Sequence, residues 1–322
     1  MIPQVYYTAF SAVALLAILA HIIRSFGRKK GIDMLPILVS VVVMMLAAPF
    51  LPGVGHTGVL LLTEVAGVST ILALTYLKRP LEFIALSLLM FYGALLYFEG
   101  FYPGYYAIGA FGAGMVIGVL YRDALGKRDH EGMKSSPKVE IRRDMLQLAI
   151  GAFVVALMLL TGIYRYVIFV AILLLYATNS IIGASKSGNL YNRLSKFERR
   201  GAEYGRGAMR LAAGVALIIG FLPFKMALFG AASLIIGDAL ATIAGVSFYK
   251  SKRLPYNRYK SYAGTFAFFI ISAAFGLFVL GPYGILIAGV LAVVESATIP
   301  IDDNISIPLV LLAAQAIISL VL

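Results

Sequence analysis

Blocks of consecutive apolar residues, each about 17 to 22 residues long, recur along almost the whole chain. A block of this length crosses a hydrocarbon core of about 30 Å when it is helical. Strands of a membrane barrel would alternate apolar and polar residues, and these blocks do not alternate. Charged residues make up 13% of the chain, which is about half the share typical of soluble domains. We therefore expect an all-α protein built as a polytopic transmembrane helix bundle.

Charged residues, glycines and prolines divide these blocks into about 12 predicted spans, with about 11 to 13 as the range. Their approximate boundaries follow from the apolar runs alone. The spans lie near residues 5–23, 34–51, 57–77, 81–98, 103–121, 145–161, 165–183, 208–222, 225–246, 262–280, 284–300 and 306–322.

Lysines and arginines are distributed unevenly between the two ends of these spans. With the N-terminus outside, one side of the membrane receives all 27 of them except Arg165 and Lys225. The positive-inside rule makes that side the cytoplasm. Topology thus accounts for the net charge of +12, and we expect no binding to nucleic acid. The long loops 122–144, 184–207 and 247–261 are expected to be cytoplasmic, so a polar substrate would arrive from that side.

Acidic residues within apolar blocks cost about 2.5 to 3.5 kcal/mol each on insertion scales, so each one needs a reason. They are Glu64, Asp238, Glu295 and the pair Asp302 and Asp303. The depth of Asp238 favours a functional role inside the bundle, on the cytoplasmic half of its span. Glu64 lies about two turns from the outer face, where either a structural hydrogen bond or a function would explain it.

The surroundings of Asp238 indicate close helix packing. Gly237, Ala241 and Gly245 recur at a spacing of four residues, which gives the helix a smooth face. We therefore expect a neighbouring helix to approach this face closely, with the carboxylate held inside the bundle.

A basic loop follows the span of Asp238 and leads into the next helix. Its cations would neutralise phosphate, while the hydroxyls, glycine and free N–H groups of the helix start would approach the phosphate oxygens. The loop also fits a simple positive-inside anchor. The candidate phosphate-binding residues are Lys250, Lys252, Arg253, Lys260, Ser261, Gly264 and Thr265.

A second polar segment joins the last two predicted spans between two prolines. Asp302, Asp303 and Asn304 offer two carboxylates and an amide, which suit a hard cation such as Mg²⁺. The same residues would also cap the start of the last helix. Under the predicted topology this turn, the basic loop and Asp238 lie at one membrane face, which is what a metal-dependent phosphoryl transfer needs.

Three ordered motifs resemble the conserved segments of the dolichol kinase and phytol kinase family. They are Gly237-Asp238-Ala-Leu-Ala241 followed by Gly245, then Lys260-Ser261-Tyr-Ala-Gly264-Thr265, then Glu295-Ser296 with Asp302-Asp303-Asn304-Ile-Ser-Ile-Pro308. The resemblance covers about residues 138–322 and begins at Glu140-Ile-Arg142-Arg143. It implies CTP as phosphate donor and a long-chain isoprenoid alcohol, or in some relatives diacylglycerol, as acceptor.

On this resemblance we predict a five-span N-terminal extension at 1–121, a charged cytoplasmic linker at 122–144 and a seven-span catalytic region at 138–322. Asp238, Asp302 and Asp303 are the candidate catalytic carboxylates and Mg²⁺ ligands, supported by Gly237, Glu295, Asn304, Arg142 and Arg143. The chain departs from the family where relatives often carry a histidine, since Met145, Leu146 and Gln147 stand there. It also has Val246-Ser-Phe-Tyr249 in place of a glycine-rich stretch.

Other functions are compatible with parts of this pattern. A prenyl-phosphate kinase, a cytidylyltransferase or a diacylglycerol kinase would also bind nucleotide and metal at a membrane face. A secondary transporter would have about twelve spans and intramembrane acids, often in two similar halves, but the first half of this chain has no counterpart to the Gly237-Asp238 helix. The sequence sets no oligomeric state.

Overall fold

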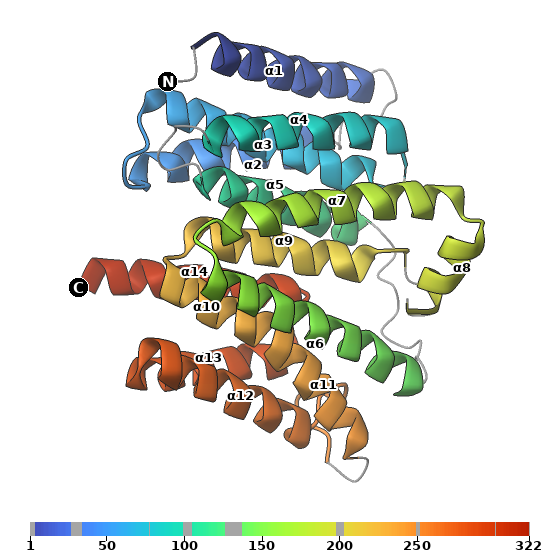
Figure 1. Ribbon diagram of the computed structural model, residues 1–322, viewed down its shortest axis with the longest axis vertical. Helices are drawn as coiled ribbons and strands as arrows, with labels where there is room; N and C mark the ends of the chain where they lie inside the picture. The colour runs from blue at the N-terminus through green and yellow to red at the C-terminus, as the bar shows by residue number, and fades with distance from the viewer. Residues whose placement is uncertain are drawn as a thin grey trace. The chain divides into compact units, whose positions relative to one another are not determined.

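The computed structural model describes residues 4–26, 34–76, 78–98, 105–125, 137–197, 203–248, 252–299 and 301–321. Within them the chain is helical apart from short connections and one isolated antiparallel bridge (Figure 1), which confirms the all-α prediction. The helices are α1 (Gln4–Phe26), α2 (Leu35–Ala47), α3 (His56–Thr75), α4 (Pro80–Phe98), α5 (Tyr105–Leu125), α6 (Pro137–Leu160), α7 (Tyr164–Ser185), α8 (Asn189–Leu194), α9 (Arg206–Phe221), α10 (Phe224–Ala231), α11 (Asp238–Ser247), α12 (Tyr262–Leu280), α13 (Pro282–Ser296) and α14 (Asp303–Val321), with 3₁₀ turns at Ala48–Phe50 and Ser195–Phe197 and a π-helical segment, η4, at Ala232–Gly237.

Many of these helices have the length and surface of membrane spans. Among the described residues, seven helical segments are long and apolar enough to cross a bilayer, and four shorter helices are also apolar. Large apolar side chains point outward from them, such as Leu16, Phe153 and Phe278, which are 64%, 61% and 85% exposed. A water-soluble helix would carry polar side chains on such a face, so these surfaces suit contact with lipid.

The contacts divide the chain into two compact units, and the first comprises Met1–His130, Arg165–Tyr191 and Tyr204–Phe221. Helix α3 lies at its centre, in contact with α1, α2, α4 and α5. From Leu61 onward every residue of α3 is buried. Helix α5 packs closely on α3, because a Cβ added at Gly114 would lie 2.1 Å from the carbonyl oxygen of Ala66. Small residues thus bring these backbones together, as is common between membrane helices.

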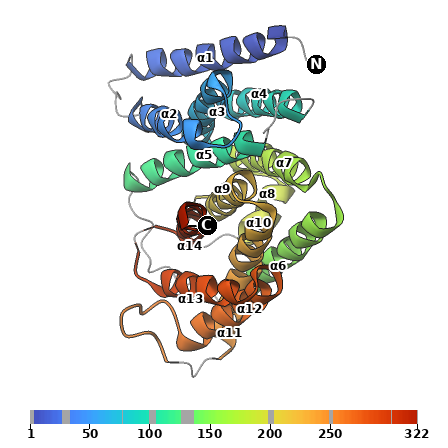
Figure 2. The ribbon, with the colours of Figure 1, turned by 90° about the vertical axis from the view of Figure 1, so that its left-hand side faces the viewer.

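The second unit comprises Glu131–Tyr164, Asn192–Glu203 and Leu222–Leu322. Helix α12 packs against α11 and α13, and α6 packs against α11 and η4 (Figure 2). A Cβ added at Gly264 of α12 would lie 2.9 Å from the carbonyl oxygen of Ala241, and one added at Gly245 would lie 3.0 Å from Ser261 Oγ. The predicted smooth face of the Asp238 helix is therefore confirmed as the surface on which α12 packs.

These units group α7 and α9 with α1 to α5. The sequence-based division at 1–121, 122–144 and 138–322 concerns function rather than packing, and it stays a prediction. Within the predicted linker, α5 continues to Leu125 and α6 begins at Pro137, while residues 126–136 lie outside the described part of the chain.

Candidate functional site

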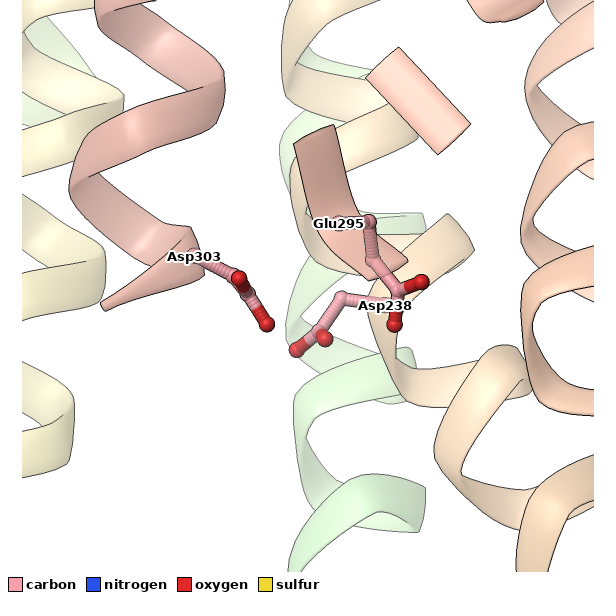
Figure 3. Close-up of side chains that lie close together, drawn as sticks. All are labelled: Asp238, Glu295 and Asp303. Atoms are coloured by element: carbon pink, nitrogen blue, oxygen red, sulfur yellow. The ribbon is translucent and has the colours of Figure 1, made fainter. Parts of the chain in front are cut away.

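Three carboxylates from three helices of the second unit converge. Asp238 is the first residue of α11, Glu295 lies in the last turn of α13, and Asp303 is the first residue of α14. One carboxylate oxygen from each lies within 4.8 Å of the others, and the side chains point toward one another (Figure 3). Glu295 is buried, whereas Asp238 and Asp303 are partly exposed. We call this group the carboxylate cluster.

The π-helical segment η4 sets the direction in which Asp238 points. It runs into α11 without a break, so Asp238 begins the α-helical turn directly after the wider π turn. A π turn shifts the helix face presented by the residues after it, and such turns are frequent at functional sites. Gln147 of α6 contacts both α11 and η4, since its Nε2 donates to Asp238 Oδ2 at 3.0 Å and to the carbonyl of Ile235 at 3.3 Å. Sequence reasoning noted Gln147 only as a departure from the family.

Lys260 lies directly on the carboxylate cluster. Its Nζ donates to Glu295 Oε1 at 2.5 Å and to Asp303 Oδ2 at 2.7 Å. Burial acts to lower the pKa of Lys260, but the nearby carboxylates of Asp303, Glu295 and Asp238 outweigh it and raise that pKa above its usual value. Thr265 adds a longer hydrogen bond to Glu295 Oε2 at 3.4 Å. Two residues predicted to bind phosphate thus contact carboxylates in this structure.

The basic loop before α12 is a tight hairpin, tied to the end of α13. Its two arms pair through hydrogen bonds from Leu254 N to Lys260 O and from Tyr262 N to Lys252 O, both at 3.1 Å. The buried side chain of Asn257 donates to the carbonyl of Ser296 at 3.0 Å and accepts from Tyr259 N at 3.0 Å. This anchor places Lys260 beside Glu295. Sequence reasoning missed Asn257 because a single asparagine in a charged loop carries no sign of its partner.

The predicted phosphate-binding groups at the start of α12 have hydrogen-bond partners within the helix end itself. Ser261 Oγ accepts from the N–H of Gly264 at 3.2 Å, and Thr265 N donates to Ser261 O at 3.0 Å. Ser261 is thus the N-cap of α12. Lys252 and Arg253 are exposed, and Arg253 Nη1 donates to the carbonyl of Tyr259 at 2.9 Å. Lys250 lies outside the described residues.

The two aspartates of the acidic turn before α14 make different contacts. Asp302 Oδ1 accepts from the backbone N–H of Asn304 at 3.1 Å and from its Nδ2 at 2.8 Å, which caps α14. Asp303 instead joins the carboxylate cluster. The predicted ligand set was Asp238, Asp302 and Asp303, and the structure places Glu295 with Asp238 and Asp303 in that group. The part that Asp302 plays in metal binding stays a prediction.

The remaining supporting residues lie on α6 and η4. Arg142 is exposed, and Arg143 Nη2 lies 3.2 Å from Asp144 Oδ1. Gly237 is buried, and a Cβ there would lie 3.2 Å from Ser272 Oγ. Gly237 therefore keeps α12 close to the helix that carries Asp238.

The donor chemistry of the carboxylate cluster fits Mg²⁺. This ion takes oxygen ligands and is usually held by one or two carboxylates together with substrate phosphates. The cluster offers three carboxylates within reach of one another, and the single Lys260 ammonium pairs with two of them, which leaves a net negative charge. Such an arrangement can hold a cation and place positive charge beside a phosphate.

No protein-family model matches the chain, no curated protein matches it, and no solved structure matches it. The geometry of the carboxylate cluster and the three sequence motifs that supply its residues are therefore the features that bear on function.

Proposed function

We propose that this chain is an integral membrane phosphotransferase that moves the terminal phosphate of CTP to the hydroxyl of an isoprenoid alcohol at the cytoplasmic face. The observation that supports it most is the convergence of Asp238, Glu295 and Asp303 around Lys260. Phosphoryl transfer depends mainly on positioning and charge stabilisation, and these side chains supply both. CTP, and dolichol or another polyprenol as acceptor, are proposed from the motif resemblance.

The residues of the cluster have separate proposed roles. Asp238, Glu295 and Asp303 would hold Mg²⁺, which supplies neutralising charge to the phosphates when it is bound. Lys260 carries a second positive charge to the same place, and Lys252 and Arg253 project from the hairpin as exposed cations. The hydrogen bond from Asn257 to Ser296 ties the hairpin that carries these cations to the end of α13, next to Glu295.

We also propose twelve spans with the N-terminus outside. The seven long apolar segments, the four shorter apolar helices and α9 together make up this number. The chain has no cysteine, so single substitutions can be labelled without background. Ser187→Cys and Tyr283→Cys, both at exposed positions, should react with a membrane-impermeant maleimide from the cytoplasmic and the outer side respectively. Labelling of both from the same side would contradict the orientation.

The activity is tested by incubating the detergent-purified protein with Mg²⁺ and terminally labelled CTP or ATP. The acceptors are dolichol, geranylgeraniol, phytol and diacylglycerol, each offered in its own reaction. Thin-layer chromatography then separates the labelled lipid products from the nucleotide. We expect label from CTP on an isoprenoid alcohol and none without Mg²⁺. Label on diacylglycerol alone would move the proposal to a diacylglycerol kinase.

A folded protein that transfers label from neither nucleotide would contradict the kinase proposal. With a prenyl phosphate as a further acceptor, label on it would indicate a prenyl-phosphate kinase. With CTP labelled at the α-phosphate, label on the lipid would indicate a cytidylyltransferase. Solute counterflow in proteoliposomes without nucleotide consumption would indicate a secondary transporter.

A further inference from the structure

Helix α6 carries a buried carboxyl group that the carboxylate cluster does not include. Asp144 is 1% exposed. Its Oδ1 accepts from Nε and Nη2 of Arg143 at 3.3 and 3.2 Å. Its Oδ2 is buried and has no hydrogen-bond partner among the described residues. A buried carboxyl oxygen without a donor is unfavourable, so this atom is suited to receive one from a ligand.

Asp144 lies beside the carboxylate cluster. It is three residues before Gln147, so both side chains are on one face of α6. Gln147 donates to Asp238 at 3.0 Å, and α6 packs against α11 and η4. The negative charges of Asp144 and Asp238 are close enough to repel each other. Asp144 therefore lies at the α6 side of the proposed reaction site.

The outer surface of the same helix is apolar and exposed. Met145, Ile150 and Phe153 are 54%, 45% and 61% exposed, which suits contact with lipid tails. A ligand that reaches Asp144 along this surface must be mostly apolar with a hydrogen-bond donor at one end. The hydroxyl of a membrane alcohol meets this description, and a hydrocarbon or an ether does not.

We propose that Asp144 binds the hydroxyl group of the acceptor alcohol through its Oδ2. This assignment rests on the proposed function and deepens it by naming the acceptor-binding residue. Arg143 occupies Oδ1 and orients the carboxyl group, so Oδ2 accepts the hydrogen bond from the lipid hydroxyl. That bond sets the alcohol oxygen beside the carboxylate cluster, where the phosphate would be held. Asp144 is thereby the residue that selects an alcohol over the corresponding ether.

The test measures binding without nucleotide or metal, so it does not depend on turnover. Geranylgeraniol and its methyl ether have the same tail, but only the alcohol can donate a hydrogen bond. We expect the wild-type protein in detergent to bind the alcohol roughly ten- to a hundredfold more tightly, as a hydrogen bond to a charged acceptor implies. Asp144→Ala should bind the two lipids equally. Asp144→Asn should keep part of the preference, because its side-chain carbonyl still accepts.

Glu140→Gln is the matched control, since it removes one negative charge about one turn earlier on α6. It should keep the full preference for the alcohol. Equal binding of both lipids by the wild-type protein, or an unchanged preference in Asp144→Ala, would overturn the assignment. If Asp144→Ala does not fold, Asp144→Asn decides, and an undiminished preference in that variant overturns the assignment.

The binding result and the transfer assay separate this assignment from the proposed function. A wild-type protein that prefers the alcohol but transfers no phosphate from CTP supports the role of Asp144 and contradicts the kinase. A wild-type protein that transfers phosphate but binds alcohol and ether equally supports the kinase and overturns the role of Asp144.

Discussion

The two units handle their acidic residues in different ways. In the first unit, the carboxylate of Asp123 pairs with both Arg206 and Arg210, and Glu64 accepts from Ser11 Oγ at 2.8 Å. In the second unit, the cluster brings three carboxylates together, and one lysine, Lys260, pairs with two of them, Glu295 and Asp303. In the first arrangement each of these carboxylates has its partners within the protein. The second leaves an excess of negative charge, which an incoming cation would balance.

The polar side chains of α3 underline this difference. Ser69, Thr70 and Thr75 each donate to the backbone carbonyl four residues earlier, at 2.6 to 2.9 Å. Hydroxyl groups that bond their own helix are satisfied without a ligand. We therefore interpret these hydroxyl groups of the first unit as structural, and we propose a chemical role for the carboxylate cluster of the second unit.

The largest expected effect comes from comparing one acidic residue from each unit, Asp238 and Glu64. Asp238→Asn should lower the rate of phosphate transfer from CTP to geranylgeraniol by about a hundredfold or more, because it would remove a proposed ligand of the Mg²⁺ that neutralises the phosphates. Glu64→Gln should leave that rate nearly unchanged, since Ser11 can still donate to the amide oxygen. Initial rates with labelled CTP measure both variants. Comparable losses in the two variants would remove the functional distinction between the units.

A second comparison concerns Lys260, the cation that the cluster shares. Lys260→Met should bind Mn²⁺ about tenfold more tightly in the absence of nucleotide, since no ammonium then competes for Glu295 and Asp303. Lys252→Met, at an exposed position of the same hairpin, should bind Mn²⁺ like the wild type. Electron paramagnetic resonance of free Mn²⁺ reports the affinity. Equal or weaker binding in Lys260→Met would show that the lysine does not compete with the metal.

The ion pairs of Asp123 should matter for stability and not for chemistry. Asp123→Asn weakens the contacts with Arg206 and Arg210 and should lower the free energy of unfolding by about 1 to 2 kcal/mol. The rate of phosphate transfer per folded molecule should stay the same. Because the chain has no tryptophan, far-ultraviolet circular dichroism is the suitable probe of melting. A loss of the phosphate-transfer rate with an unchanged melting temperature would show that Asp123 has a functional role.

The smallest expected effects come from two helical glycines. Gly264→Ala would place a Cβ 2.9 Å from the carbonyl oxygen of Ala241 and should destabilise the second unit by about 1 kcal/mol. Gly207→Ala in α9 meets nothing within 4 Å and should stabilise the first unit by about 0.5 kcal/mol, through helix propensity. Opposite shifts of the melting temperature are expected. Equal shifts would show that the α11 and α12 backbones are less closely packed.

Local patterns were enough to predict the all-α class and the close approach at Asp238. Apolar length sets the helical spans because every backbone group must be paired within the membrane. The spacing of Gly237, Ala241 and Gly245 gave the packing face, because residues three or four apart share one side of a helix. The sequence by itself also singled out Asp238, Lys260, Glu295 and Asp303, because each carries charge in or beside an apolar block.

Only the tertiary structure decided which of these residues meet. Glu295 and Asp303 contact the same lysine although they lie 35 and 43 residues from it in the chain. Gln147 reaches Asp238 across 91 residues. The turn of η4 rotates the helix before Asp238, and apolar residues in that segment give no sign of it. Contacts of this kind depend on how helices are rotated and stacked, which is a property of the packed bundle and not of any local run of residues.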